Sequence, residues 1–180
     1  MFLVVGIVLF VAGCGNENKT PTESAGLKTV GREQYVLQIK KWEAEMHKSL
    51  ELNTVTASQA IKAYTDFVNA FPADSLAPDF LFKSGEIATA TKQYPQALMF
   101  YETITSKYPK YKLVDVSLYL QGVLLDNYLN DDAKAKVIYE QVIAKYPESS
   151  YARDARAAIG NLGKSDEELI KEFEKKNGVK

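Results

Sequence analysis

Apolar residues recur at every third or fourth position over much of the 180-residue chain, which is the spacing of one face of an amphipathic helix. The first such stripe predicts a helix from Arg32 to about Leu52, and a second predicts a helix over residues 57–70. The pattern is typical of helices that bury one face against each other. The stripes consist of Tyr35, Ile39, Trp42, Met46 and Leu50, and of Ala60, Tyr64, Phe67 and Phe71.

Three aromatic–proline pairs interrupt this pattern at a nearly constant interval. Proline lacks an amide hydrogen and disfavours helical geometry in the residue before it, so each pair predicts the end of a helix. Because the interval repeats, we expect repeated units of helix, turn, helix and proline. The pairs are Phe71-Pro72, Tyr108-Pro109 and Tyr146-Pro147.

Alanine, tyrosine and glycine residues recur in register with these prolines. A glycine in a helix interior costs about 1 kcal/mol relative to alanine, so its recurrence indicates a compensating gain. We expect each glycine to let the backbones of two helices touch, with the alanine at the crossing and the tyrosine packed beside it. The recurring residues are Ala60, Ala97 and Ala135, then Tyr64, Tyr101 and Tyr139, and finally Gly85, Gly122 and Gly160.

This register resembles that of tetratricopeptide repeats, the TPR family of stacked helix pairs. The resemblance implies an all-α, TPR-type α-solenoid of antiparallel helix pairs, with about three and a half repeats and a C-terminal capping helix. Ser165 and Glu168 have the spacing of a capping box at the start of that last helix. The signature positions match Leu81, Gly85, Ala97, Tyr101 and Pro109 in one copy, and Leu118, Gly122, Ala135, Tyr139 and Pro147 in the next.

The TPR domain is expected to span residues 32–180. Its first repeat is degenerate, because Lys48 stands where the signature glycine belongs. The expected units are this first repeat at residues 32–72, full repeats at 76–109 and 113–147, and terminal helices with the cap at 150–176.

The N-terminal region carries a different signal. An uncharged apolar run from Phe2 to Val11 leads into Ala12 and Gly13, which is the layout of a secretory signal peptide. The segment that ends in Cys14 resembles a bacterial lipobox, which implies removal of residues 1–13 and acylation of Cys14, for example with palmitate. Residues 14–31 are rich in Gly, Asn, Thr and Ser and predict a flexible linker. The alternatives are a buried cysteine and a membrane-spanning helix, which needs roughly 20 apolar residues.

Charge and composition exclude several functions. The chain has 22 Lys and Arg against 23 Asp and Glu, for a formal net charge of -1, so no nucleic-acid partner is expected. One cysteine and one histidine, His47, exclude a disulfide framework and a Cys/His zinc site. No nucleophile set, phosphate loop or metal motif stands at usable spacing, so we expect no catalytic residues, no metal and no cofactor. An envelope enzyme and a self-assembling structural protein are the alternatives to a binding protein.

The TPR resemblance implies that the first helix of each pair forms an inner, protein-binding face. Acids and exposed apolar groups on this face suit extended or helical protein segments. The alternative for Phe82, Tyr119 and Val123 is that they fill the core between helices. The residues expected on the face are Asp79, Phe82, Glu86, Tyr119, Val123, Asp126, Asn127, Asp154 and Asn161.

The combination of a lipobox with repeats that end in Tyr-Pro resembles two groups of envelope proteins. One is the BamD-like lipoproteins, which implies an adaptor in outer-membrane protein assembly. The other is the TPR domain of the Tol-Pal accessory protein YbgF, which implies a periplasmic scaffold associated with cell division. Gly15 replaces the aspartate that retains many lipoproteins in the inner membrane. We therefore expect a lipid-anchored outer-membrane protein that faces the periplasm and binds envelope proteins or peptides, with its oligomeric state left open.

Overall fold

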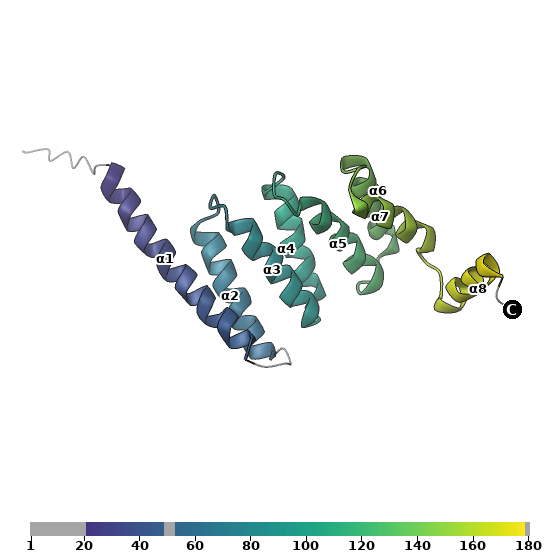
Figure 1. Ribbon diagram of the computed structural model, residues 1–180, viewed down its shortest axis with the longest axis horizontal. Helices are drawn as coiled ribbons and strands as arrows, with labels where there is room; N and C mark the ends of the chain where they lie inside the picture. The colour runs from purple at the N-terminus through teal and green to yellow at the C-terminus, as the bar shows by residue number, and fades with distance from the viewer. Residues whose placement is uncertain (1–20, 49–52, 179–180) are drawn as a thin grey trace, which may run out of the picture.

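The protein is all-α over the residues that the computed structural model describes, 21–48 and 53–178, and no β-strand occurs in those two ranges. The helices follow one another along the long axis of the molecule (Figure 1). They are α1 (Pro21–Met46), α2 (Thr54–Ala70), α3 (Ala77–Ala90), α4 (Tyr94–Lys107), α5 (Val114–Asn127), α6 (Asp132–Lys145), α7 (Ser150–Asn161) and α8 (Asp166–Asn177).

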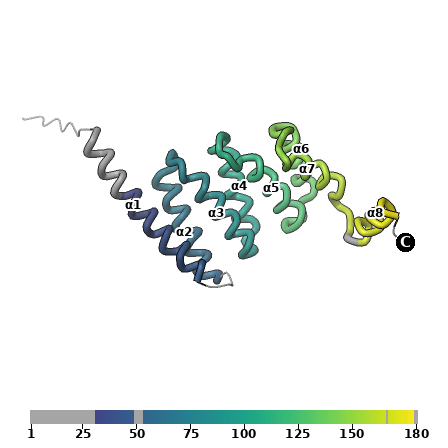
Figure 2. Tube along the Cα trace, in the orientation of Figure 1, coloured from purple at the N-terminus to yellow at the C-terminus, as the bar shows by residue number. Residues whose placement is uncertain are grey.

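Successive helices pack side by side from α1 to α7, so that each helix covers an apolar face of its neighbours. α5 also contacts α7, which brings together the first helices of two consecutive pairs. The chain runs back and forth between neighbouring helices as it advances along the stack (Figure 2). This arrangement confirms the predicted TPR-type α-solenoid.

The ends of the helices follow the signals that predicted them. The C-caps of α2, α4 and α6 are Phe71, Tyr108 and Tyr146, and a proline follows directly in each case. α2 begins at Thr54, earlier than expected. The reason is an N-cap, because the Asn53 side chain accepts hydrogen bonds from two backbone amides of the first turn at 2.8 and 3.3 Å.

α1 begins at Pro21, whereas the sequence predicted a linker up to residue 31 and a helix from Arg32. This prediction was wrong over the part of the linker that the structure describes. Proline is well suited to the first position of a helix, because its fixed φ is helical and its missing amide hydrogen would have no partner there. A proline that was interpreted as part of a flexible segment therefore starts the helix.

The apolar stripe of α1 packs on the core as predicted. Ile39 is 2% exposed, and Trp42 and Met46 are partly buried against the same cluster. Tyr35 packs edge-on against the aromatic ring at the end of α2, with the ring centroids 5.6 Å apart. Leu50, the last predicted member of the stripe, lies outside the described residues.

An ion pair joins α1 to the turn between α2 and α3. The Arg32 guanidinium donates to both carboxylate oxygens of Asp74, at 2.6 and 3.2 Å. This hydrogen bonding lowers the pKa of Asp74, which also accepts from the Leu76 amide at 2.9 Å. The pair therefore favours the charged carboxylate and fixes the conformation of the turn.

The recurring tyrosines and alanines form the centre of the core. Tyr64, Tyr101 and Tyr139 are the largest side chains that are fully buried. The signature alanines are buried as well, as expected for residues at helix crossings, with exposures of 1% for Ala60 and 0% for Ala97 and Ala135.

The signature glycines make room for tyrosine rings. A Cβ atom added to Gly85 would lie 2.6 Å from the Tyr101 ring, and one added to Gly122 would lie 2.5 Å from the Tyr139 ring. The expectation that helix backbones touch at these positions was therefore wrong, because the ring of the partner helix fills the space. Gly160 has no neighbour within 4 Å of its Cβ position beyond its own helix backbone, so no close approach occurs there.

The difference at Gly160 follows from both the sequence and the position of α8 (Figure 1). The predicted capping box is present, since Ser165 Oγ accepts from the Glu168 amide at 3.3 Å and the Glu168 carboxylate accepts from the Ser165 amide at 2.9 Å. Yet α8 extends away from the stack (Figure 1), and Ile170 and Phe173 remain 57% and 65% exposed. α8 has no tyrosine, and it does not cover Gly160 in the way that α4 covers Gly85 and α6 covers Gly122.

The signal peptide predicted at residues 1–13 and the lipidation site predicted at Cys14 lie outside the described residues. Within the described part of the chain, no helix combines the length and the apolar character that a membrane span requires.

Candidate functional site

The residues predicted for the inner face all lie on the first helices of the pairs. α3 carries Asp79, Phe82 and Glu86, while α5 carries four of the set and α7 carries Asp154 and Asn161. The four residues of α5 are Tyr119, Val123, Asp126 and Asn127. Their placement on α3, α5 and α7 follows from the repeat register.

Five of these nine residues come together in one hollow, here called the inner groove. It has a volume of about 560 Å³ and is formed by α5, α6, α7, the segment that leads into α8 and the first turn of α8. The predicted residues that line it are Tyr119, Val123, Asp126, Asn127 and Asn161, and the other lining residues are Asn130, Asp132, Tyr139, Ala158, Gly163, Lys164 and Leu169.

Tyrosine rings form one wall of the inner groove. Tyr119 lies between Tyr139 of α6 and Tyr151 of α7, with ring centroids 5.7 and 5.3 Å away. Val123 also packs against the core cluster below. Tyr119 and Val123 therefore pack against the core and line the groove at once, while their predicted role in partner binding stays a prediction.

The charges at the inner groove are mostly negative. Asp126 accepts a hydrogen bond from the Tyr139 hydroxyl at 3.2 Å. Burial, together with the nearby Asp132 carboxylate, raises the pKa of Asp126 above its ordinary value. The one lysine that lines the groove, Lys164, donates to both carboxylate oxygens of Glu172 at 2.8 and 2.9 Å. Its charge is thus compensated, whereas Asp126 and Asp132 have no cationic partner among the described residues.

The other predicted residues lie outside the inner groove. Phe82 packs against Tyr101 at 5.7 Å between ring centroids and is partly buried, so it fills core. Glu86 is exposed at the surface. Neighbouring side chains still shield its carboxylate from part of the solvent, and this desolvation raises the pKa of Glu86. The Asp154 carboxylate forms an ion pair with the guanidinium of the adjacent Arg153, with 3.5 Å between Oδ1 and Nε.

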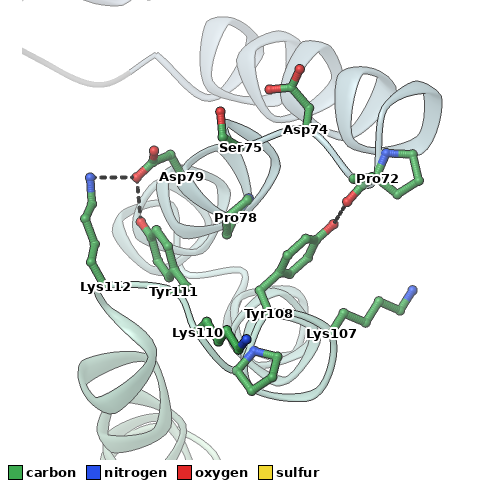
Figure 3. A pocket seen from close by; sticks show the side chains of 12 residues that line it. Pro72, Asp74, Ser75, Pro78, Asp79, Lys107, Tyr108, Lys110, Tyr111 and Lys112 are labelled. Atoms are coloured by element: carbon green, nitrogen blue, oxygen red, sulfur yellow. Dashed lines mark hydrogen bonds and ion pairs between the residues drawn. The ribbon is translucent and has the colours of Figure 1, made fainter.

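A second hollow, here called the edge groove, was not predicted from the sequence (Figure 3). It has a volume of about 570 Å³ and lies between the turn after α2 and the turn after α4. Asp79, which was predicted for the inner face, lines this groove instead. The lining residues are Pro72, Ala73, Asp74, Ser75, Pro78, Asp79, Lys107, Tyr108, Pro109, Lys110, Tyr111 and Lys112.

Hydrogen bonds hold the two turns of the edge groove together. The Tyr108 hydroxyl donates to the Pro72 carbonyl at 2.8 Å, and the Tyr111 hydroxyl donates to the Asp79 carboxylate at 2.8 Å (Figure 3). Lys112 Nζ lies 3.1 Å from the same carboxylate. Burial and the bond to Asp79 raise the pKa of Tyr111. The sequence signal for this site was the Tyr-Pro pair, which had been interpreted only as a helix end.

Neither groove has the features of a metal centre. No group of three or more His, Cys, Asp and Glu side chains that could hold a metal ion occurs in the residues that the structure describes.

The fold and the two grooves define a class of protein, the helical-repeat solenoids that expose grooves between stacked helix pairs. Two segments of the chain, residues 79–111 and 116–149, match the family model described as Tetratricopeptide repeat. A comparison with curated protein sequences gives no match. The matched segments cover α3 with α4 and α5 with α6, so these two helix pairs are the part of the chain that is similar to tetratricopeptide repeats. Such repeats support a role in binding other proteins.

Proposed function

We propose that this protein is a non-catalytic TPR adaptor that binds basic segments of partner proteins in the inner groove. The observation that carries the proposal is the groove itself, in which tyrosine rings adjoin carboxylates that have no cationic partner among the described residues. A lysine or arginine side chain is attracted both to an aromatic face and to a carboxylate.

The raised pKa of Asp126 supports a basic partner. A carboxylate whose pKa is raised by burial and by a neighbouring acid is destabilised in its charged form. A cation bound beside Asp126 and Asp132 removes part of this penalty, so the groove gains more from a basic segment than from an acidic one. Acidic segments meet like charge there.

A lipid anchor at Cys14 is the second part of the proposal. The lipobox resemblance supports acylation of Cys14 after removal of residues 1–13, and Gly15 supports the outer membrane facing the periplasm. Such an anchor with two or more acyl chains gives stable attachment to the bilayer. The adaptor then presents its inner groove to envelope proteins close to the membrane surface.

Two processes fit an adaptor at this location. The BamD-like resemblance favours outer-membrane protein assembly, and the YbgF-like resemblance favours a Tol-Pal and cell-division scaffold. The identity of the proteins that occupy the inner groove in cells distinguishes the two, since the first process supplies assembly components and the second supplies Tol-Pal components.

Photo-crosslinking in intact cells tests the inner groove. A photoreactive residue at Asn127 or Asn161, which are both exposed and line the groove, is expected to capture partner proteins. The same residue at Glu102, exposed on α4, is the position control. The Asp126→Asn substitution keeps the shape of the side chain and removes its charge, so adduct yield should fall at least about threefold.

The Glu102→Gln variant provides the matched loss of one negative charge away from the groove. It should leave the adducts at Asn127 unchanged. Equal adduct yields at Glu102 and Asn127, or adducts that persist in Asp126→Asn, would show that partners bind elsewhere.

Replacement of Cys14 by serine tests the anchor. Cells that produce the native chain should incorporate a palmitate analogue into it and retain it in salt-washed membranes. The Cys14→Ser chain should take up no label and move to the soluble fraction, because the acylated thiol is gone. Continued retention of Cys14→Ser in salt-washed membranes would contradict the proposed tether.

A further inference from the structure

We propose that the edge groove is a second, independent binding site, which takes an extended acidic segment of a partner protein. The site lies on the turns that join consecutive repeats, away from the inner groove, and the two hollows share no lining residue. The adaptor would then hold two segments of opposite charge.

The charges of the edge groove favour an acidic occupant. Both of its acids already have cationic partners, since Asp74 is paired with Arg32 at 2.6 Å and Asp79 with Lys112 at 3.1 Å. Lys107 and Lys110 also line the groove, and neither forms an ion pair with another described residue. Lys107 and Lys112 lie on opposite sides of the hollow, with Lys110 between them (Figure 3). A segment lying in the groove therefore meets uncompensated positive charge.

The shape and chemistry of the walls favour an extended segment. Three prolines and two tyrosines are among the twelve lining residues, and their rings present flat apolar surfaces to a ligand. A third hollow, of about 530 Å³, adjoins the edge groove and shares Pro72, Lys107 and Tyr108 with it. Val68 of α2 and Met99 of α4 also line this third hollow. A segment with apolar residues next to its acids can contact both hollows.

Hydrogen bonds within the chain already hold the walls of the edge groove in place. The hydrogen bonds from Tyr108 to Pro72 and from Tyr111 to Asp79 join its two walls. The Arg32–Asp74 ion pair holds the turn between α2 and α3. A preformed site loses less conformational entropy on binding.

This combination occurs at one repeat junction only. The positions that follow Pro109 are Lys110, Tyr111 and Lys112, whereas Glu148, Ser149 and Ser150 follow Pro147. Ala73, Asp74 and Ser75 follow Pro72. The basic, tyrosine-lined wall is thus a property of this junction and not of the repeat in general.

An anionic membrane surface is the main competing ligand. Recognition of anionic lipid by sequence clusters typically involves about four to eight Lys and Arg residues. The edge groove offers two uncompensated lysines within a concave wall, which suits a peptide better than a flat bilayer.

Fluorescence anisotropy with the purified full chain tests the proposal. The probe is a fluorescein-labelled peptide in which Asp-Glu pairs alternate with Pro-Leu pairs, and the comparison peptide carries lysine at every acidic position. The double variant Lys107→Gln with Lys110→Gln should bind the acidic peptide about three- to tenfold more weakly than the native chain, because two exposed charge contacts are lost. Ala73→Glu places an acid in the groove and should weaken binding further.

The matched control is Lys92→Gln with Lys136→Gln. Both residues are exposed, both lie outside the grooves, and the change in net charge is the same. This control should bind the acidic peptide like the native chain, and circular dichroism should show equal helicity in all variants.

Three results would overturn the proposal. One is equal binding of the acidic peptide by the native chain and by Lys107→Gln with Lys110→Gln. The second is an equal loss of binding in the control pair, which would indicate a general charge effect. The third is binding to vesicles of anionic phospholipid that depends on Lys107 and Lys110 while the acidic peptide does not bind, which would assign these lysines to a membrane surface.

Discussion

Replacement of Tyr139 by alanine is expected to lower the free energy of unfolding by about 3–5 kcal/mol. The side chain is 1% exposed, and its ring fills the space beside Gly122 and packs near Tyr119. Removing the ring leaves a cavity between α5 and α6 that the surrounding helices can fill only in part. The hydroxyl bond to Asp126 at 3.2 Å is lost as well.

Urea denaturation followed by circular dichroism measures this effect. The control is Tyr139→Phe, which keeps the ring and removes only the hydrogen bond, so we expect a loss of about 0.5–1.5 kcal/mol. A Tyr139→Ala chain within about 1 kcal/mol of the native chain would mean that the tyrosine does not hold the two helices together.

The repeat register could be predicted because its signals are local. An aromatic–proline pair ends a helix for reasons that lie within two residues, and the ends at Phe71, Tyr108 and Tyr146 agree with the sequence. The start of α1 was not predicted because proline is compatible with two kinds of local structure. Pro21 in a polar segment favours a turn, yet proline is also common at the first position of a helix.

The role of Gly160 could not be predicted from its own spacing. It stands in register with Pro147, as Gly85 and Gly122 stand in register with the preceding prolines. The two packed glycines, however, each need a tyrosine of the following helix, and no tyrosine follows Gly160 in the chain. A glycine signal is therefore informative only when its partner residue is considered with it.

The inner groove could be predicted in part. The repeat register places Asn127 and Asn161 correctly on the first helices, where both line the groove. It does not separate groove residues from core residues, because a first helix of the solenoid has apolar contacts with its own partner and with the next pair. Phe82, for example, packs between Tyr101 and Tyr111 and lies in neither groove.

The edge groove could not be predicted, because it exists only after two repeats have stacked. Pro72 and Tyr108 lie far apart in the sequence, and packing of α2, α3 and α4 brings the Tyr108 hydroxyl to the Pro72 carbonyl. The charge pattern is likewise a property of the fold. Only in the folded chain do Arg32 and Lys112 compensate the two acids and leave Lys107 and Lys110 without acidic partners among the described residues.

Alanine substitutions at two glycines of the same register are expected to have opposite effects. Gly122→Ala should lower the free energy of unfolding by about 1–3 kcal/mol, because the added Cβ lies 2.5 Å from the buried Tyr139 ring, which would have to shift. Gly160→Ala should raise it by up to about 1 kcal/mol, because the new methyl group meets nothing within 4 Å and alanine favours the helix. Urea denaturation of the two variants beside the native chain measures both values.

A double-mutant cycle identifies the ring as the cause of the effect at Gly122. In the Tyr139→Ala background the clash is absent, so Gly122→Ala should be neutral or stabilising there, and the coupling energy should amount to about 1–3 kcal/mol. The Tyr139→Phe background keeps the atoms that the Cβ approaches, so Gly122→Ala should remain destabilising in it. If Gly122→Ala were equally destabilising in all three backgrounds, the cost would arise from the helix backbone, and the pairing of glycine with tyrosine would not explain why a glycine stands at this position.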